Sequence, residues 1–527
     1  MNRRERVDRV DLIPPPTGAA ATTRADAYAL APLLNCLLRE VAEPFPETEA
    51  EGEEAADPAG PADRRVHRLA ASGRLLRVRG VRRPVEPEVL VDGAWVRLGH
   101  TALVGLVADE LTRHTGVANH ELPAEMGDSR DVVAALLAAR ARTTPPADPY
   151  LRSEQCLLTG HPYHPAPKAR GGGPATRWLP YAPEAYARFP LVLLGLREDA
   201  VAEDGDTSAL DALGTAPPGY RLLPAHPWQL DLVAAALAPA FADGRLVRLG
   251  TTPFPVRPTA AIRTVHVPDP DLFLKFSLDV RVTNDIRRLW RHDLLKLRRT
   301  DAAATRALAA ADGAGGAGGA GGWLSDLGYR TADFAFEELA VLVREGLSER
   351  LPSGTSACLA AGLVEGFAGS PLDRAADPAR WWEAYLAQVV PPALTAFDTH
   401  GVVIEAHLQN TLVACAADGT PVRALYRDAE GVKLLTDVGR AAGWERLVYC
   451  LVVNNLVEMA GALADRHPGL DPWPAVRAEL RRSKLPEADA LLSAPSLPAK
   501  TNLLLRWTGA DGADARYRPM PNPLRED

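Results

Sequence analysis

The strictest pattern in this sequence is the two-residue alternation of DLFLKFSLDVRVT at 271–283. Apolar side chains take every second position from Leu272 to Val282, and from Lys275 onward polar side chains fill the positions between them. Successive side chains of a β-strand point to opposite faces, so the pattern predicts a half-buried strand with a polar working face. Lys275 belongs to the polar series yet has apolar neighbours on both sides, which marks it as a candidate functional cation.

Some of the other segments show helical periodicity, and others show the periodicity of strands. Leucines at helical spacing predict a helix over 26–43, and short alternating runs predict strands within 66–98. Further helices are expected within 101–142 and at about 443–464, and a strand pair at 401–414 and 422–428. The acidic Pro44–Asp63 segment and the glycine-rich 313–322 segment are predicted to be loops, the second a flexible insertion.

Composition excludes several classes of protein. The net charge of -8, from 59 Lys+Arg and 67 Asp+Glu, argues against a nucleic-acid binder. The five cysteines form no CxxC pair, so a disulfide framework or cysteine zinc site is not expected and a reducing cytoplasm fits. The N-terminus lacks an apolar signal-peptide core, and no run of 18 apolar residues predicts a membrane span.

The loop GHPYHPAPKARGGG at 160–173 concentrates His161, His164, Lys168 and Arg170. The His-x-x-His spacing is compatible with zinc, but the two cations would repel a metal and no acidic or thiol ligand is adjacent. Cationic side chains with close-packing glycines suit a polyanion, and a solvated basic loop is the equally weighted alternative. His226, in an HPWQ segment, is expected to be structural.

Three cations recur at intervals of twelve residues: Arg263, Lys275 and Arg287. A helix is predicted to start near Arg287, capped by Thr283 or Asn284. A helix N-terminus beside an arginine favours a carboxylate or phosphate. The alternative is a set of ordinary surface cations.

A second polar cluster lies within the predicted strand segment 401–414, directly after its apolar start: Glu405, His407, Gln409 and Asn410. Asp428 stands eighteen residues later, on a turn after a strand. An Asn followed by an Asp in this order resembles the magnesium ligands of kinases, and hard oxygen ligands suit Mg²⁺. Ordinary turn chemistry is the alternative, but so many polar residues are rare in a core. Together these cations and oxygen ligands predict a nucleoside-triphosphate site. The remaining cations could bind a second, carboxylated substrate.

The chain resembles the IucA/IucC family, the siderophore synthetases that work independently of non-ribosomal peptide synthetases. The matching motifs span about 400 residues in family order. They are LLNCLLRE at 33–40, GHPYHPAPKARGG at 160–172, HPWQ at 226–229, RTV at 263–265, KFSLDVRVTNDIR at 275–287, EAHLQN at 405–410 and RDAEG at 427–431. The resemblance implies a hand-shaped α+β fold with mainly antiparallel sheets and a helical C-terminal part. It implies a thumb at 1–150, fingers at 151–375 with the insertion at 311–322, and a palm at 376–527.

The resemblance also implies a reaction. ATP, with Mg²⁺, would adenylate a carboxylic acid, usually citrate or a derivative, and release pyrophosphate. An amine, or sometimes the hydroxyl of an amino alcohol, would then attack the acyl carbon and release AMP, as a step of siderophore biosynthesis. A cytoplasmic homodimer is expected.

Residue roles follow from the same resemblance. It implies ATP contacts from Arg263, Lys275, His407, Asn410, Asp428, His161 and Lys168. It implies contacts to the carboxylic acid from Thr283, Arg287, His164 and Arg170, and metal contacts from Glu405, Asn410 and Asp428. The catalytic residues would be His407, Arg287 and Lys275, with His407 helping to deprotonate the amine.

One position departs from the family. Many members carry Ser two residues before the arginine of the RTV motif, where this chain has Ala261. Thr259 lies two residues earlier and, on a strand, would face the same side. Two other functions stay open: a kinase-like phosphotransferase, although no G-x-G-x-x-G loop follows a strand, and a non-catalytic carboxylate-binding homologue. Release of AMP rather than ADP would distinguish the ligase from the kinase.

Overall fold

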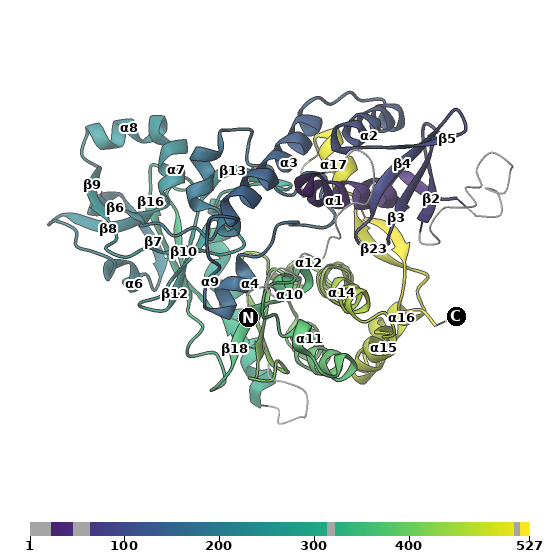
Figure 1. Ribbon diagram of the computed structural model, residues 1–527. Coiled ribbons are helices and arrows are strands. Elements are labelled where there is room, and N and C mark those ends of the chain that lie inside the picture. Colours follow the sequence, from purple (N-terminus) through teal and green to yellow (C-terminus); the bar gives the residue numbers. More distant parts are fainter. Residues whose placement is uncertain (1–22, 46–63, 314–321, 511–516, 527) are drawn as a thin grey trace, which may run out of the picture.

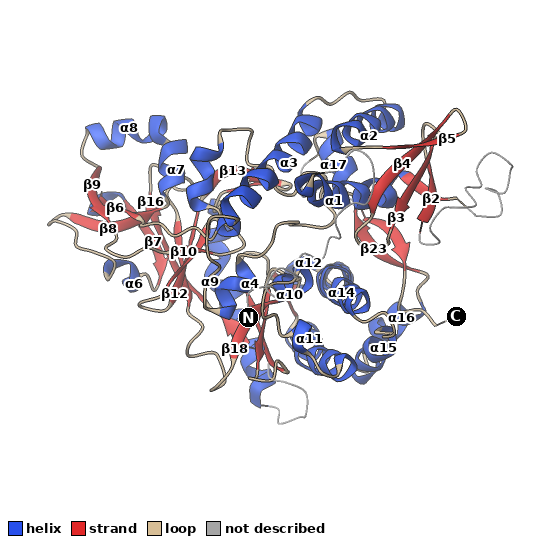
Figure 2. Ribbon diagram, viewed as in Figure 1, coloured by secondary structure: helices blue, strands red, loops and turns tan. Residues whose placement is uncertain are grey.

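The computed structural model describes residues 23–45, 64–313, 322–510 and 517–526. The chain forms three packed parts around a central region (Figure 1). Helices and antiparallel strands occur in all three parts (Figure 2), so the predicted α+β class is confirmed. Most of the predicted loops at 44–63 and 313–322 lie outside the described residues.

The N-terminal part packs an antiparallel sheet against helices. Helix α1 (Arg24–Val41) begins at Thr23, whose side chain accepts from the Asp26 N–H while the Asp26 carboxylate accepts from the Thr23 N–H. Four of its predicted face leucines, Leu30, Leu33, Leu34 and Leu37, are buried, and Leu38 is partly buried against the same core. The sheet is a meander in sequence order. Its strands are β1 (Ala42–Pro44), β2 (Arg64–Leu69), β3 (Leu75–Arg79), β4 (Val85–Val91) and β5 (Ala94–Arg97), followed by α2 (His100–Thr115) and α3 (Glu121–Arg140).

The middle part contains two antiparallel sheets and a hairpin. The six-stranded sheet has the order β10-β11-β12-β17-β16-β7, and the three-stranded sheet the order β8-β6-β9. The strands are β6 (Val192–Arg197), β7 (Val201–Gly205), β8 (Tyr220–Ala225), β9 (Leu246–Thr251), β10 (Arg257–Pro258), β11 (Thr264–Val267), β12 (Leu272–Phe276), β13 (Leu278–Val282), β14 (Asp285–Arg287), β16 (Asp326–Ala332) and β17 (Val341–Glu345). The helices are α4 (Pro149–Glu154), α5 (Ala175–Trp178), α6 (Ser208–Asp211), α7 (Pro227–Leu232), α8 (Ala234–Ala242) and α9 (Arg291–Gly313).

The predicted continuous strand at 271–283 is wrong in one respect. It breaks at Ser277 into β12, in the six-stranded sheet, and β13, in the hairpin with β14. The Ser277 hydroxyl accepts from the Leu289 N–H at 2.8 Å, which fixes the break. All of β12 is buried, so Lys275 projects into the protein interior rather than from a solvated face.

The C-terminal part places a sheet of order β15-β21-β20-β18 against mostly helical structure. Its strands are β15 (Gly322–Leu324), β18 (Ser356–Leu359), β20 (Thr411–Cys415) and β21 (Pro421–Arg427), with short pairs β19 (Val402–Val403) with β22 (Lys433–Leu434) and β23 (Ser496–Lys500) with β24 (Tyr517–Pro521). Its helices are α10 (Ala360–Glu365), α11 (Pro378–His400), α12 (Leu435–Val438), α13 (Arg440–Leu447), α14 (Glu458–Arg466), α15 (Trp473–Arg482), α16 (Pro486–Ser493) and α17 (Asn502–Thr508). A π-helical segment, Val448–Val457, joins α13 to α14.

This run, Arg440–Arg466, is the one helix among the described residues that is long and apolar enough to cross a membrane. Its most apolar stretch is 78% buried inside the protein, which is the behaviour of a core helix. The helix predicted at about 443–464 is therefore confirmed, and it forms the centre of the C-terminal core.

The chain passes between the three parts more than once. Strands β15 and β18 precede residue 376 yet belong to the C-terminal sheet, and Leu503 and Trp507 of α17 pack into the N-terminal core. The predicted boundary at residue 150 falls inside α4. The division at 150 and 375 stays a prediction.

Candidate active site

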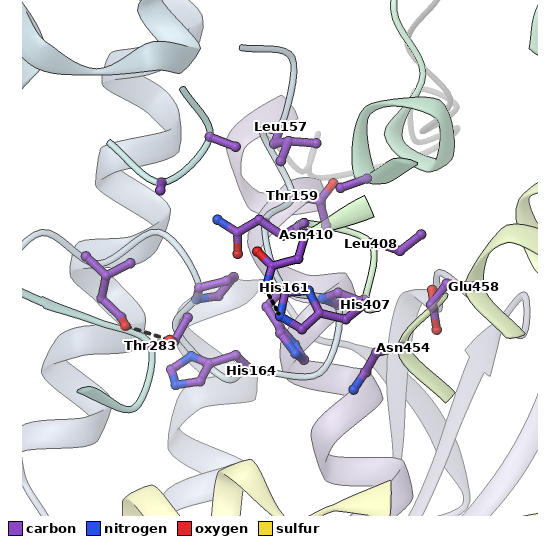
Figure 3. Close-up of a pocket in the computed structure, with 18 of the residues that line it drawn as sticks. Leu157, Thr159, His161, His164, Thr283, His407, Leu408, Asn410, Asn454 and Glu458 are labelled. Atoms are coloured by element: carbon purple, nitrogen blue, oxygen red, sulfur yellow. Dashed lines mark hydrogen bonds between the residues drawn. The ribbon is translucent and has the colours of Figure 1, made fainter. Parts of the chain in front are cut away.

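A cavity of about 420 Å³ lies where the three parts meet. All twelve residues predicted from the sequence for the site line it: His161, His164, Lys168, Arg170, Arg263, Lys275, Thr283, Arg287, Glu405, His407, Asn410 and Asp428. Figure 3 shows His161, His407 and Asn410 grouped at the centre of this cavity, with Thr283 on one side and Glu458 on the other.

Lys275 connects the middle part to the C-terminal part. Its Nζ donates to Asp428 Oδ1 at 2.6 Å and to Glu430 Oε2 at 2.8 Å. The side chain is only 4% exposed, so these charge-assisted bonds lie in a low-dielectric setting that strengthens them.

Asp428 follows β21 with a φ of 87°, a strained left-handed conformation for a non-glycine residue. Burial acts to raise the pKa of its carboxyl, but Lys275 and Arg344 outweigh that effect and hold the pKa far below its usual value. The strained turn therefore presents an ionised carboxylate to the cavity.

Arg263 reaches the same cluster from a tight turn. Its guanidinium donates to the carbonyls of Arg287 and Arg288, both at 2.9 Å, and lies 3.5 Å from Glu430. The expectation that Thr259 stands on a strand is wrong, because the Ile262 N–H donates to the Thr259 carbonyl and the segment forms a turn. The Thr259 hydroxyl donates to the Thr264 carbonyl at 3.0 Å and closes that turn.

The predicted helix start at 283–287 is also wrong, because these residues form the β13–β14 hairpin and α9 begins only at Arg291. Thr283 takes the left-handed corner of the hairpin with a φ of 62°. Arg287 Nη2 donates to the Val282 carbonyl and to Thr283 Oγ1, both at 2.6 Å. Burial, then the charge of Arg263, lowers the pKa of Arg287 to about 10.

The 160–173 loop brings two cations to the cavity, and both pair with one buried carboxylate. Lys168 Nζ donates to Glu184 Oε1 at 2.6 Å, and Arg170 lies 3.2 Å from the same oxygen. His161 Nδ1 accepts from the Tyr163 N–H and His164 Nδ1 accepts from the Ala166 N–H, so both imidazoles hold turns. Contact of this loop with ATP stays a prediction.

His407 and its neighbours form a turn braced by the π-helical segment. The Leu408 N–H donates to the Asn454 carbonyl at 3.1 Å, and the Asn410 amide lies 3.3 Å from His407 Nε2. Glu405 pairs with Arg446 and lies 3.6 Å from His407. Burial acts to raise the pKa of Glu405, but Arg446 and His407 lower it to about 2.

Sequence reasoning missed several residues of the site. Glu430 and Arg344 complete the cluster around Lys275, and Arg446 and Lys500 add two cations near Glu405. The alternation Asp428-Ala-Glu430 after a strand could have indicated the first of these. The other three stand far from any motif, so no local signal identifies them.

The structure supports the structural interpretation of His226, which caps α7 by accepting from the Trp228 N–H and is buried. Within the described parts of the chain, no group of three or more His, Cys, Asp or Glu side chains is arranged to hold a metal ion. All five cysteines are free and buried.

Two family models match the chain in succession. The IucA / IucC family model matches residues 149–365, which include Arg263, Lys275 and Arg287. A second model, described as ferric iron reductase FhuF-like transporter, matches residues 379–515, which include His407 and Asp428.

Curated relatives and solved structures agree with the first match. The chain is 28% identical to the L-2,3-diaminopropanoate–citrate ligase of Staphylococcus aureus, over 72% of this chain and 75% of that protein. It is 28% identical to the rhizobactin siderophore biosynthesis protein RhbC of Rhizobium meliloti, over 72% and 76%. The fold matches ATP-bound aerobactin synthetase IucA of Klebsiella pneumoniae with a TM-score of 0.78 at 20% identity, covering 95% of this chain and all of that one. It also matches the petrobactin biosynthesis protein AsbB of Bacillus anthracis with a TM-score of 0.75 at 16% identity, covering 95% of each chain. The resemblance to the IucA/IucC family is therefore confirmed by the family model over residues 149–365.

Proposed function

We propose that this chain is an ATP-dependent ligase of siderophore biosynthesis. It adenylates a carboxylic acid, citrate or a citrate derivative, and condenses the product with an amine. Relatives named as ligases join citrate to diaminopropanoate, spermidine or ornithine. Their names support the acid and the class of nucleophile.

The observation that best supports the proposal is that Arg287 is a mostly buried cation without a carboxylate partner among the described residues. This guanidinium is mostly buried, has Arg263 as a neighbour, and forms no ion pair with a carboxylate within the described residues. Two neighbouring buried cations are costly unless an anion joins them. A carboxylate bidentate on Arg287 and a triphosphate beside Arg263 and Lys275 would supply that anion.

The residues can then be assigned to the two half-reactions. Lys275, Arg263 and His407 bind the phosphates, and Thr283 orients Arg287 toward the acid. A carboxylate oxygen of the acid attacks the α-phosphorus and pyrophosphate leaves. The amine nitrogen then attacks the acyl carbon, the bond to AMP breaks, and His407, oriented by Glu405, accepts the proton that the nitrogen loses.

Of the predicted magnesium ligands, Asp428 and Asn410 fit the ion, whereas Glu405 does not. Glu430, which also follows β21, fits in its place. Oε1 of Glu430 is buried and has no partner among the described residues, and Asp428 supplies a second hard oxygen. Glu405 does not fit, because Arg446 and His407 occupy its two oxygens. The ion, bound with ATP, would neutralise phosphate charge beside Asp428, Glu430 and Asn410.

The remaining family expectations are part of this proposal. The three parts would be thumb, fingers and palm of a hand, with ATP bound between fingers and palm. The enzyme would act as a homodimer in the cytoplasm, where ATP is supplied.

The test is incubation of the purified protein with ATP, Mg²⁺ and citrate in the presence of hydroxylamine, which traps an activated acyl group. Citrate-dependent AMP and a citryl hydroxamate are expected. ADP in place of AMP would instead identify a kinase-like phosphotransferase. Absence of turnover with citrate and with other carboxylic acids would identify a non-catalytic homologue, in line with Ala261.

A further inference from the structure

One carboxylate in the cavity has no role in the scheme above. Glu458, the first residue of α14, lines the cavity and is only 2% exposed. Its Oε2 is buried and has no hydrogen-bond partner within the described part of the chain. A buried charged oxygen without a partner is costly, so a ligand group that satisfies it would bind strongly.

The π-helical segment places Glu458 next to the reaction centre. Its wider turn brings Tyr449, Asn454 and Glu458 to the cavity at spacings of five and four residues. The Asn454 carbonyl accepts from the Leu408 N–H, so this helix face lies directly against the His407 turn. Figure 3 shows Glu458 and Asn454 on the side of His407 opposite Thr283. Glu458 therefore lies beyond His407 from the proposed acid site.

Three arginines at this end of the molecule are already paired with other carboxylates. Arg83 pairs with Glu365 at 3.7 Å, Arg82 with Asp465 at 2.5 Å, and Arg466 with Asp373 at 3.1 Å. Burial, then the negative charge of Glu458, raises the pKa of the Tyr163 hydroxyl, which is hydrogen-bonded to Glu458 and therefore stays neutral. Arg39 stacks on the Tyr163 ring, and Oε2 of Glu458 remains the oxygen of this carboxylate that a ligand group can still satisfy.

The missing partner is a cation supplied by a substrate. ATP and a carboxylic acid are anions, and the Mg²⁺ that accompanies ATP is assigned above to Asp428 and Glu430, so the amine is the substrate that can bring a cation to Glu458. A carboxylate beside the reacting nitrogen would stabilise the protonated, unreactive form of that nitrogen. Glu458 is therefore suited to an ammonium group that does not react.

We propose that Glu458 binds the second, non-reacting ammonium group of an amine substrate that carries two amino groups. This assignment rests on the proposed function, because it presumes that the cavity receives an amine. Glu458 then selects diamines over monoamines of equal length.

The experiment compares 1,3-diaminopropane with propylamine. Calorimetry measures the binding of each amine to the protein with ATP and citrate present, and a coupled assay measures amide formation. The wild-type protein is expected to favour the diamine by about 10- to 100-fold, the range for a hydrogen bond to a charged group. Glu458→Gln should abolish that preference, and Glu458→Asp should retain part of it.

Glu445→Gln is the matched control, because Glu445 stands on the same helical run but is exposed and outside the cavity lining. It should keep the wild-type preference. Equal preference in Glu458→Gln and wild type, or no preference in wild type, would overturn the assignment. Citrate-dependent exchange of pyrophosphate into ATP needs no amine and is expected in every variant. Its absence from the wild type would refute the proposed function, whereas diamine binding would still test Glu458.

Discussion

The cations on the β12–β14 strands and those on the 160–173 loop line one cavity but are neutralised in different ways. Lys168 and Arg170 share Glu184, a buried acid outside the cavity lining. Lys275 instead pairs with Asp428, which lines the cavity, and with Glu430, whereas Arg287 has no carboxylate partner among the described residues. We therefore expect the loop cations to act mainly on the stability of the fold and the strand cations to act mainly on a ligand.

The largest expected effect is on enzymatic activity, and it distinguishes the strand cations from the loop cations. Lys275→Met should lower the rate of AMP formation by about 1,000-fold, because it removes a cation from the phosphates during transfer. Lys168→Met should lower the rate less than 10-fold, because Arg170 still neutralises Glu184. Circular dichroism would verify that both variants are folded. Equal losses in the two variants would contradict the comparison.

A second variant tests whether the loop cations stabilise the fold, by measuring the free energy of unfolding. Glu184→Gln leaves Lys168 and Arg170 buried without a counter-charge, so the free energy of unfolding should fall by about 3 kcal/mol. Denaturant titration provides the measurement. An exposed acid on the same part of the chain, Glu198, should tolerate the same change within about 0.5 kcal/mol.

A third variant sharpens the assignment of the acid. Arg287→Ala should lower kcat/KM for the acid by about 100-fold, the loss of one buried bidentate contact. The affinity for ATP alone should change little, because Lys275 and Arg263 remain. If ATP binding and the acid KM weakened together, Arg287 would belong to the phosphate site.

The smallest effect concerns pH. Burial lowers the pKa of His161 to about 3, and also lowers the pKa of His164. Below the unfolded value of about 6.5 the unfolded chain binds more protons than the folded chain. Stability is therefore complete above about pH 6.5 and declines as the pH falls toward 3.

His161→Asn keeps an acceptor for the Tyr163 N–H but cannot be protonated in this range. Between pH 6 and 4 the wild type should lose about 1.4 kcal/mol per pH unit more than this variant. Unfolding curves at several pH values would measure the difference, and parallel curves would show that His161 is not a buried neutral base.

Local periodicity predicted much of the fold and failed where distant contacts decide. The alternation at 271–283 continues through Ser277, yet the chain changes sheets there because Ser277 is bonded to Leu289. The same apolar positions serve both strands, so the pattern contains no sign of the break. The packing of α17 on the N-terminal core was likewise not predictable from nearby residues.

For the site, the sequence identified the residue types and the structure brought all twelve to one cavity. It did not reveal their partners. Glu184 lies sixteen residues from Lys168, and Arg446 lies 41 from Glu405, so no motif spacing connects either pair. The charge state of each candidate depends on these partners, which is why the loop and strand cations looked alike in the sequence.

The most direct test of the account uses citrate labelled with ¹⁸O in its carboxylates, incubated with ATP, Mg²⁺ and an amine. Attack of a carboxylate oxygen on the α-phosphorus predicts one labelled oxygen in the AMP released and none in pyrophosphate. Label in inorganic phosphate together with ADP would show attack on the γ-phosphorus and contradict adenylation at the Arg287 site.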